Sequence, residues 1–342
     1  MIVTLHEPKD DPKWMAFLHA GHLVGLEYDL AWRGVFSDTY GHRPHYLAAY
    51  SGMSVVGVMP LFAAPVWGAG RCLVSTPFLD CGGPLADSDA AREALLGAAL
   101  EMRATSSAPY LEIRSLTPDN AATSVRTDKA KVVLDLPVDE ATLWQQLDAK
   151  VRNQVRKAQK AGLTVAVEDA EQVPSFHRVY ARNMRDLGSP AAHPKLWTNV
   201  FRHFGDRARL ILVRHRDVPI AGAIWLSCGQ IAYVPWASAL RSHFHLCPNN
   251  LLYWEAVRMA CAAGCRQFDF GRSTVHSGPY RFKLQWGARP VQLYWHYYCR
   301  PGVRPPVAAQ ERRSLQLAAA AWKRFPLPIA NMLGPRILGR MP

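Results

Sequence analysis

The sequence lacks several features that would identify common classes of protein. No run of 18 apolar residues occurs in its 342 residues, so we expect no membrane-spanning helix. The seven cysteines are odd in number and follow no disulfide or zinc spacing. There is no Walker loop, dinucleotide fingerprint or Ser-His-Asp pattern. These absences argue against a disulfide-rich domain, a P-loop kinase, a dehydrogenase and a serine hydrolase.

The N-terminal segment MIVTLHEPKDDPKW is polar and acidic, where a signal peptide is basic and then apolar. Cys261 and Cys265 are four residues apart on an expected helix with apolar neighbours. This spacing favours a pair of buried free thiols and a reducing compartment. We therefore expect a cytoplasmic protein, with the inner membrane surface as an alternative place.

Acidic residues are scarce compared with basic ones. The chain has 40 Lys+Arg against 27 Asp+Glu, a formal net charge of +13. Such an excess favours anionic partners: nucleic acid, phosphorylated or lipid-linked sugars, or an acidic membrane face. A basic protein without any polyanionic partner is the alternative. With 49% hydrophobic and 20% charged residues, the chain is globular and long enough for two domains.

The same order of elements appears twice. Each half shows strand, turn, strand, a further strand, a loop, a helix and a final strand. In the first half these segments are 45–62, 71–76, 89–104 and 110–115, and in the second they are 208–227, 231–239, 249–264 and 266–271. The pattern predicts a duplicated α/β fold.

A basic helix is expected between the halves, over residues 143–163, ending at Gly162. Val151, Val155 and Ala158 form a narrow apolar stripe, while Arg152 and Arg156 share another face. We interpret Arg152 and Arg156 as candidates for steering an anionic substrate. A solvated helix face is the alternative.

The tail, residues 301–342, has no acidic residue after Glu311, whereas Arg312, Arg313 and four more cations follow. Leu315, Ala318, Ala319, Trp322 and Phe325 form one helical stripe. The stripe predicts a tail docked on the body of the protein, or else one lying on an anionic membrane.

The segment FDFGRSTVHSGPYRFKLQWGARP (268–290) is the strongest candidate for a site. Polar groups this dense after a buried strand are costly unless they meet one another or a ligand. Asp269 alternates with two phenylalanines and is a candidate to orient or deprotonate an amine, and a buried salt bridge is its alternative. Lys283 is a candidate to stabilise negative charge. The remaining candidates, for substrate binding, are Arg272, Ser273, Tyr280 and Trp286.

The loop RSHFHLCPNN (241–250) leads into the second-half helix. Asn249 is a candidate to bind substrate at the helix start, where free N–H groups attract anions. The loop has no glycine, which weakens the case for a pyrophosphate cradle. His243, His245 and Cys247 alternate, yet no fourth ligand is near, so we expect no metal. Trp236 is either core or a platform for a sugar.

Several separated motifs resemble one family. KVRNQVRKAQKAGL, ARNMRDLGSP, VPWASALR, PNNLLYWEA, FDFGRST and YRFKLQWGA, in this order, are similar to the FemAB-like branch of the GNAT acyltransferase superfamily. The likeness is greatest to FemAB-type proteins that accompany exosortase and exopolysaccharide gene sets. It covers residues 140–300 by motif and the first half by pattern alone.

The resemblance implies two tandem GNAT-like domains, with mixed twisted sheets flanked by helices. The expected boundaries are 1–140, a basic linking helix 141–163, a second domain 164–300 and a basic amphipathic tail 301–342. In the family's Phe-Lys-x-x-Phe/Trp-Gly pattern, Lys283 and Gly287 are the matching positions. The coenzyme-A-binding relatives carry a glycine motif where this chain has RSHFHLCPNN, so that departure puts acetyl-CoA in doubt.

The resemblance further implies transfer of an acyl or aminoacyl group to an amine on a cell-envelope or exopolysaccharide precursor. Aminoacyl-tRNA and acyl-CoA both stay open as donors. The alternatives are an acetyl-CoA-dependent N-acetyltransferase of an amino sugar, and a non-catalytic protein that binds envelope polysaccharide.

Overall fold

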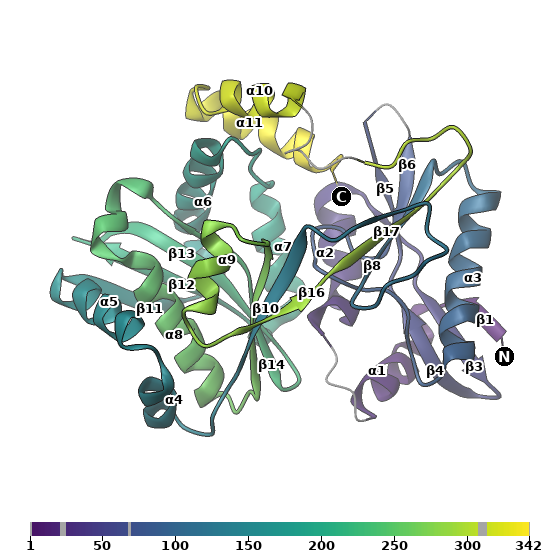
Figure 1. Ribbon diagram of the computed structural model, residues 1–342, viewed down its shortest axis with the longest axis horizontal. Coiled ribbons are helices and arrows are strands. Elements are labelled where there is room, and N and C mark those ends of the chain that lie inside the picture. Colours follow the sequence, from purple (N-terminus) through teal and green to yellow (C-terminus); the bar gives the residue numbers. More distant parts are fainter. Residues whose placement is uncertain (1, 21–24, 68–69, 307–312, 342) are drawn as a thin grey trace. The chain divides into compact units, whose positions relative to one another are not determined.

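The computed structural model describes residues 2–20, 25–67, 70–306 and 313–341 (Figure 1). The chain divides into two compact units. Unit 1 comprises Met1–Ala130, Gln292–Pro306 and Gly339–Pro342, and unit 2 comprises Lys131–Val291 and Val307–Leu338. Both are α/β, and each contains the strand, strand, strand, helix, strand order expected from the sequence.

Unit 1 contains two sheets. The four-stranded sheet has the order β1 (Ile2–Leu5), β3 (Leu47–Ser51), β4 (Ser54–Met59), β7 (Leu85–Ala86). The six-stranded sheet has the order β2 (Arg43–Pro44), β5 (Phe62–Pro65), β6 (Arg71–Val74), β8 (Tyr110–Ser115), β17 (Tyr294–Cys299), β9 (Ser124–Arg126). Its main helices are α1 (Asp11–His19), α2 (Ala31–Tyr40) and α3 (Asp89–Thr105).

The crossover in unit 1 is the expected one. Strands β6 and β8 are parallel, and α3 connects them. Ser88 caps α3 by accepting a hydrogen bond from the Ala91 N–H at 3.2 Å. Leu95 and Ala99 bury one face of the helix against the sheet.

A buried polar network holds the carboxyl end of this parallel pair. The Arg114 guanidinium donates to Glu112 Oε1 at 2.7 Å and to the carbonyls of Thr76 and Leu79, both at 2.8 Å. It also lies 4.2 Å from the ring centroid of Trp295. Because every contact offsets the cost of burying the charge, this network is a structural feature of unit 1.

The last strand before the tail lies in unit 1. We predicted a second domain ending at 300, but β17 pairs antiparallel with β8 and β9 of the six-stranded sheet. The first unit likewise ends near 130 in the structure, earlier than the expected 140. Pairing between strands so distant in sequence leaves no local pattern, which is why the sequence did not indicate it.

Unit 2 is built on one seven-stranded sheet. Its order is β11 (Leu163–Glu168), β12 (Ala208–His215), β13 (Val218–Cys228), β14 (Ile231–Ala239), β15 (Gln267–Thr274), β10 (Lys129–Asp135), β16 (Arg289–Gln292). Its helices are α4 (Glu140–Gln146), α5 (Ala149–Lys160), α6 (Val173–Leu187), α7 (Pro194–Phe204), α8 (Pro248–Ala262), α9 (Gly278–Leu284), α10 (Arg313–Trp322) and α11 (Leu327–Leu338).

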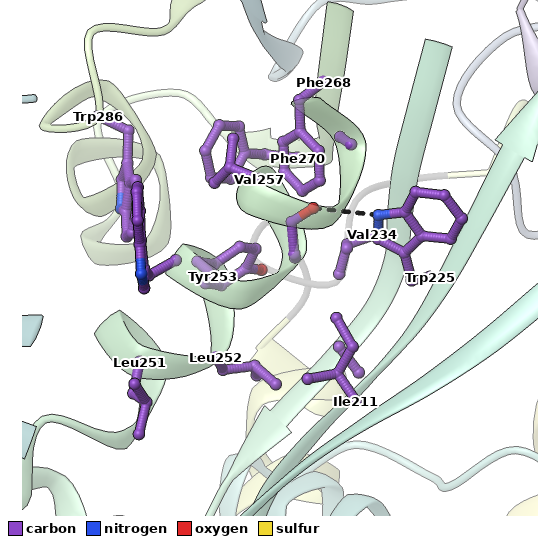
Figure 2. Packing of buried hydrophobic residues seen from close by; sticks show 14 of the residues in the cluster. Ile211, Trp225, Val234, Leu251, Leu252, Tyr253, Val257, Phe268, Phe270 and Trp286 are labelled. Carbon is purple, nitrogen blue, oxygen red and sulfur yellow. Dashed lines mark hydrogen bonds between the residues drawn. The ribbon is translucent and has the colours of Figure 1, made fainter. Parts of the chain in front are cut away.

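Helices cover both faces of this sheet. Along β12, Ile211 and Val213 pack in the core beneath α5 and α8, whereas Leu212 points to the other face, toward Phe176 of α6. Figure 2 shows the α8 side, where the Trp225 Nε1–H donates to the Ala256 carbonyl of α8 at 3.1 Å. The alternation of strand residues thus explains how one sheet buries two helical layers.

The expected helix 143–163 is two helices. Asp148 ends the first segment and caps α5 by accepting from the Lys150 N–H at 2.7 Å. After α5, Gly162 has φ of +75°, consistent with the expected glycine stop. Val151, Val155 and Ala158 are fully buried, as the apolar stripe predicted.

Strands β14 and β15 pair in parallel over only three residues. Their last pair is Tyr233 with Asp269, although β14 continues to Ala239 and β15 to Thr274. β15 pairs with β10 on its other side. The two strands therefore diverge toward their carboxyl ends.

Candidate functional site

A cavity of about 410 Å³ lies at the start of α8, and we call it the α8 cleft. Eleven residues line it: Lys150, Gln154, Phe244, Cys247, Pro248, Asn249, Asn250, Gly278, Arg281, Phe282 and Gln285. Its volume lies in the range of small-ligand pockets.

The topology of unit 2 places this cleft where the sheet opens. Phe244 and the start of α8 follow the carboxyl end of β14, and α9 follows the carboxyl end of β15. In open α/β sheets, ligands bind outside the carboxyl ends of parallel strands, at points where the strands part. The α8 cleft is at such a point, and α5 supplies its remaining wall.

The charge of the α8 cleft is positive. Lys150 and Arg281 are its two permanent cations, and none of its eleven described lining residues is acidic. Gln154, Asn249 and Gln285 add amide groups, while Phe244 and Phe282 supply apolar surface. The Asn250 Nδ2 donates to Gln154 Oε1 at 2.9 Å, which fixes both amides. This lining suits a ligand that has an anionic group and an apolar part.

Side chains, more than backbone, would hold an anion here. Pro248 at the first position of α8 has no N–H, and the Asn250 N–H donates to the Cys247 carbonyl at 3.1 Å. In the first turn of α8, this leaves the Asn249 N–H without an acceptor among the described residues. The glycine-free loop thus offers little of a backbone phosphate cradle, as its sequence suggested.

Asp269 does not point into the α8 cleft. It is 3% exposed, and its Oδ2 lies 2.8 Å from the Lys131 ammonium of β10. Its Oδ1 accepts a hydrogen bond from the Gly271 N–H at 2.8 Å. The alternative of a buried salt bridge describes it correctly, with a lysine in place of the expected arginine as partner. The structure gives Asp269 no access to a substrate amine.

Lys283 is also buried, at 7% exposure. Its Nζ donates to the Gly271 and Arg272 carbonyls of β15, at 2.8 and 3.1 Å. Lys283 therefore ties α9 to β15, and Arg281, two residues earlier, lines the cleft. We interpret Lys283 as a positioning residue.

Arg152 and Arg156 lie away from the cleft. On α5, Lys150 and Gln154 flank one side of the buried stripe and the two arginines flank the other. Arg156 lies over the Trp144 ring, 5.4 Å from its centroid. The cation that α5 supplies to the cleft is Lys150.

Both expected tryptophans belong to packed regions. Trp286 is 1% exposed and packs beside Phe270 and Tyr253 in the core (Figure 2). Trp236 packs edge-on against Trp197 of α7, 5.1 Å between ring centroids, on the face of the sheet opposite α8. Neither lines the α8 cleft.

The other candidates, Arg272, Ser273 and Tyr280, do not line the cleft. Arg272 is half-buried on β15, and Tyr280 of α9 packs partly against the core. The Ser273 hydroxyl is buried and has no hydrogen-bond partner in the described chain. Of the ten predicted site residues, Asn249 alone is among those that line the α8 cleft.

Arg281 and Gln285 are the residues that sequence reasoning undervalued. They are four residues apart on α9 and face the cleft, whereas Lys283 and Trp286 are three apart and face the core. Helical periodicity over 278–286 contained this signal, but the segment was interpreted as one polar cluster.

Unit 1 has a second cavity, of about 370 Å³. Its lining includes Asp89, Glu93, Asp119, His296 and Tyr298. The His296 Nε2 accepts from the Asp119 N–H at 2.9 Å, and the Tyr298 hydroxyl donates to the Asp119 carboxylate. This cavity is acidic, so it does not suit the anionic ligands expected from the net charge.

The described residues lack two features that would assign other functions. No group of three or more His, Cys, Asp or Glu is placed to hold a metal ion. Within the same residues, no helix is long and apolar enough to cross a membrane. None of the seven cysteines, all of which lie in the described residues, forms a disulfide, and Cys261 and Cys265 are buried as predicted.

The tandem fold resembles that of solved structures. FemX has a TM-score of 0.64 at 16% identity, over 88% of this chain and 98% of its own. L-PGS from Bacillus licheniformis has a TM-score of 0.55 at 13% sequence identity, and the match covers 99% of both chains. A tandem GNAT protein from the clavulanic acid biosynthesis pathway has a TM-score of 0.55 at 13% sequence identity. The match covers 89% of this chain and 99% of that protein.

The sequence alone also identifies a domain. Residues 146–284 match the family model of the acetyltransferase (GNAT) domain, and this range contains every residue of the α8 cleft except Gln285. Among curated proteins, the sequence has no match. The predicted α/β fold of two GNAT-like domains is confirmed. Residues 146–284 match the GNAT domain family, and the chain has a fold similar to those of FemX and the tandem GNAT protein.

Proposed function

We propose that this protein transfers an acyl or aminoacyl group to an amine of a cell-envelope or exopolysaccharide precursor, and that the α8 cleft holds the phosphate-bearing carrier of the donor. The observation that carries the proposal is the cleft itself: a cationic cavity, with no acidic residue among its described lining, at the diverging ends of two parallel strands in a GNAT domain.

The similar structures and the family model support acyl transfer as the class of reaction. FemX and the C-terminal domain of a putative lysylphosphatidylglycerol synthetase from Agrobacterium fabrum are among the similar structures, and the family model is that of an acetyltransferase domain. All are consistent with transfer of an activated acyl group. The identity of the acceptor is inferred from this likeness and from the motifs, and the experiment below tests it.

The chemistry requires an amine nitrogen to attack the acyl carbonyl of the donor. A C–N bond forms, the ester or thioester bond to the carrier breaks, and the amine proton leaves to solvent or to the departing carrier oxygen or sulfur. We place the carbonyl between the diverging strands, where β14 residues beyond Tyr233 no longer pair with β15. Backbone N–H groups there are suited to stabilise the oxyanion of the tetrahedral intermediate.

Four residues of the α8 cleft have a direct part in this scheme. Lys150 and Arg281 neutralise phosphate of the carrier, Arg281 with the geometry for bidentate contact. Phe282 and Phe244 supply apolar surface for a base or an alkyl segment. Lys283 and the Lys131–Asp269 pair keep β15 and α9 in position and make no direct contact with the reacting atoms.

Aminoacyl-tRNA is the donor that the cleft favours. Coenzyme A is bound by GNAT proteins through a glycine-rich loop, whereas here the loop has no glycine and α8 begins with Pro248, which has no N–H. Recognition by side-chain cations suits a nucleic-acid phosphate, and the net charge of +13 suits a polyanion. An acyl-CoA-dependent N-acetyltransferase of an amino sugar is the second candidate, favoured by the acetyltransferase family match.

A label-transfer assay tests the proposal. Purified protein is incubated with either radiolabelled aminoacyl-tRNA or radiolabelled acetyl-CoA, together with extracted lipid-linked precursors or free amino sugars. Transfer from aminoacyl-tRNA to the lipid-linked fraction is the expected result. Label passing from acetyl-CoA to an amino sugar would establish the second candidate. Specific precursor binding with no transfer from either donor would contradict both and leave the non-catalytic alternative.

The double variant Lys150→Gln/Arg281→Gln tests whether the donor binds in the α8 cleft. It is expected to raise the donor KM by about 10- to 100-fold, since each charged hydrogen bond contributes about 1.5–3 kcal/mol before solvent screening. The matched control is Lys157→Gln/Lys160→Gln, which removes the same charge from exposed positions of α5 outside the lining. An equal rise in both variants would show that general charge, and not the cleft, recruits the donor.

A further inference from the structure

The helices α10 and α11 form a hairpin whose inner side is docked on unit 2. Ala330 is 2% exposed, and a Cβ on Gly334 would lie 2.9 Å from the Ala191 backbone nitrogen. Arg185 of α6 donates to the Phe325 carbonyl at 3.1 Å, in the turn between the helices. The tail is therefore docked, but through Ala330 and Gly334 of α11 and not by burial of the expected stripe, since α10 has no buried residue. Glu311 and Arg312 lie outside the described residues.

The outer side of the hairpin is apolar. Leu317 is 64% exposed on α10, and Met332 and Ile329 are 59% and 42% exposed on α11. On α11, Ile329 and Met332 are three residues apart and lie opposite the docked Ala330 and Gly334. None of the residues of α10 is buried. A surface helix normally turns its apolar face to the core, so this outer face is unusual.

Cations surround this outer face. Arg313 precedes Leu317 by one turn, and Arg336 follows Met332 by one turn, on the same sides of their helices. Lys323 and Arg324 lie in the turn between the helices, and the sequence has no acidic residue after Glu311. An apolar face flanked by the cations of the hairpin itself complements an anionic lipid surface.

We propose that the outer face of the α10–α11 hairpin, formed by Leu317, Ile329, Met332 and their flanking cations, docks the protein on an anionic bilayer. Helices of 10 and 12 residues are too short to span, so they lie in the headgroup region with the apolar side chains inserted. The inference goes beyond the proposed function and does not depend on which donor the α8 cleft binds.

Bilayer is a better partner for this face than RNA. Single-stranded nucleic acids stack their bases on aromatic side chains, and the exposed apolar residues here are aliphatic or methionine. A methionine or leucine side chain gains by burial in hydrocarbon but gains little from a base edge. The docked inner face keeps the hairpin folded before it meets a membrane, so binding does not require the ordering of a free chain.

Vesicle co-sedimentation of the full chain tests the proposal. The probes are phosphatidylcholine vesicles alone and vesicles of phosphatidylcholine with phosphatidylglycerol in a ratio of 3:1. Binding to the second and little binding to the first is expected. Arg324→Gln/Arg336→Gln should weaken binding to the anionic vesicles by about 25-fold, because each cation lost weakens it by about fivefold. Leu317→Gln/Met332→Gln should weaken it by about tenfold or more.

Two controls separate the hairpin from general effects. Lys157→Gln/Lys160→Gln removes the same charge from α5, and Met53→Gln replaces an 87% exposed methionine of unit 1. Both should bind vesicles like the unchanged protein, and all variants should keep the same thermal transition because the positions are exposed. Equal losses in variants and controls would overturn the proposal. So would a hairpin variant that loses tRNA binding while it keeps vesicle binding.

Discussion

Replacement of Asp269 by asparagine should destabilise unit 2 strongly. The Asp269–Lys131 pair is 2.8 Å long, and both side chains are less than 10% exposed. Asparagine keeps an acceptor for the Gly271 N–H but leaves the Lys131 ammonium without its buried counter-ion. Breaking such a pair costs about 3–5 kcal/mol. For a unit of this size, the transition temperature should fall by roughly 6–20 °C.

Thermal and urea unfolding of three variants measures this. Asp269→Asn is compared with the double variant Asp269→Leu/Lys131→Met, which removes both charges and should recover much of the lost stability. Arg289→Gln is the control, because the Arg289–Asp135 pair is exposed and 3.5 Å long and should contribute less than about 1 kcal/mol. An Asp269→Asn protein as stable as the control would refute the structural role and return Asp269 to the candidates for catalysis.

Three further predictions concern other parts of the fold. In urea titrations, Gly222→Ala should destabilise unit 2 by about 1–3 kcal/mol, because the new Cβ would lie 2.8 Å from Leu212 and 3.0 Å from Phe176. Gly97→Ala should stabilise unit 1 by about 0.5–1 kcal/mol, because Gly97 is in the middle of α3 with open space around it. Burial lowers the pKa of His42 to about 4. As the pH falls, His42 is therefore protonated in the unfolded chain before it is protonated in the folded protein. Up to about 3 kcal/mol of stability should be lost between pH 6.5 and pH 4. In urea titrations over that range, His42→Phe should have a shallower pH dependence, and an unchanged dependence would contradict the assignment.

The repeated order of strands and helices was readable from the sequence because it is local. Turns such as Ser51–Gly52 and the strand alternation around 208–227 depend on neighbouring residues, and the helices 89–104 and 249–264 were placed within two residues. Strand β17 could not be placed, since its partners β8 and β9 lie far away in sequence.

The candidate site was readable in part. The loop 241–250 and the segment after 268 both contribute residues to the lining of the α8 cleft, among them the predicted Asn249. The rotation of α9 determines which of its side chains face the cleft. Asp269 is held away from it by Lys131, which lies 138 positions earlier in the sequence and shares no motif with it. Charged residues in a motif can therefore serve the scaffold, while their neighbours serve the ligand.

The most direct test of the α8 cleft is a fluorescence titration of tRNA against the full chain at several salt concentrations. Lys150→Gln/Arg281→Gln should weaken binding at least tenfold and lower the slope of log K against log salt by about 1.4, one phosphate contact for each cation. Lys157→Gln/Lys160→Gln should change the slope little. Equal slopes for the unchanged protein and the cleft variant would contradict the claim that this cavity holds the phosphates of the donor.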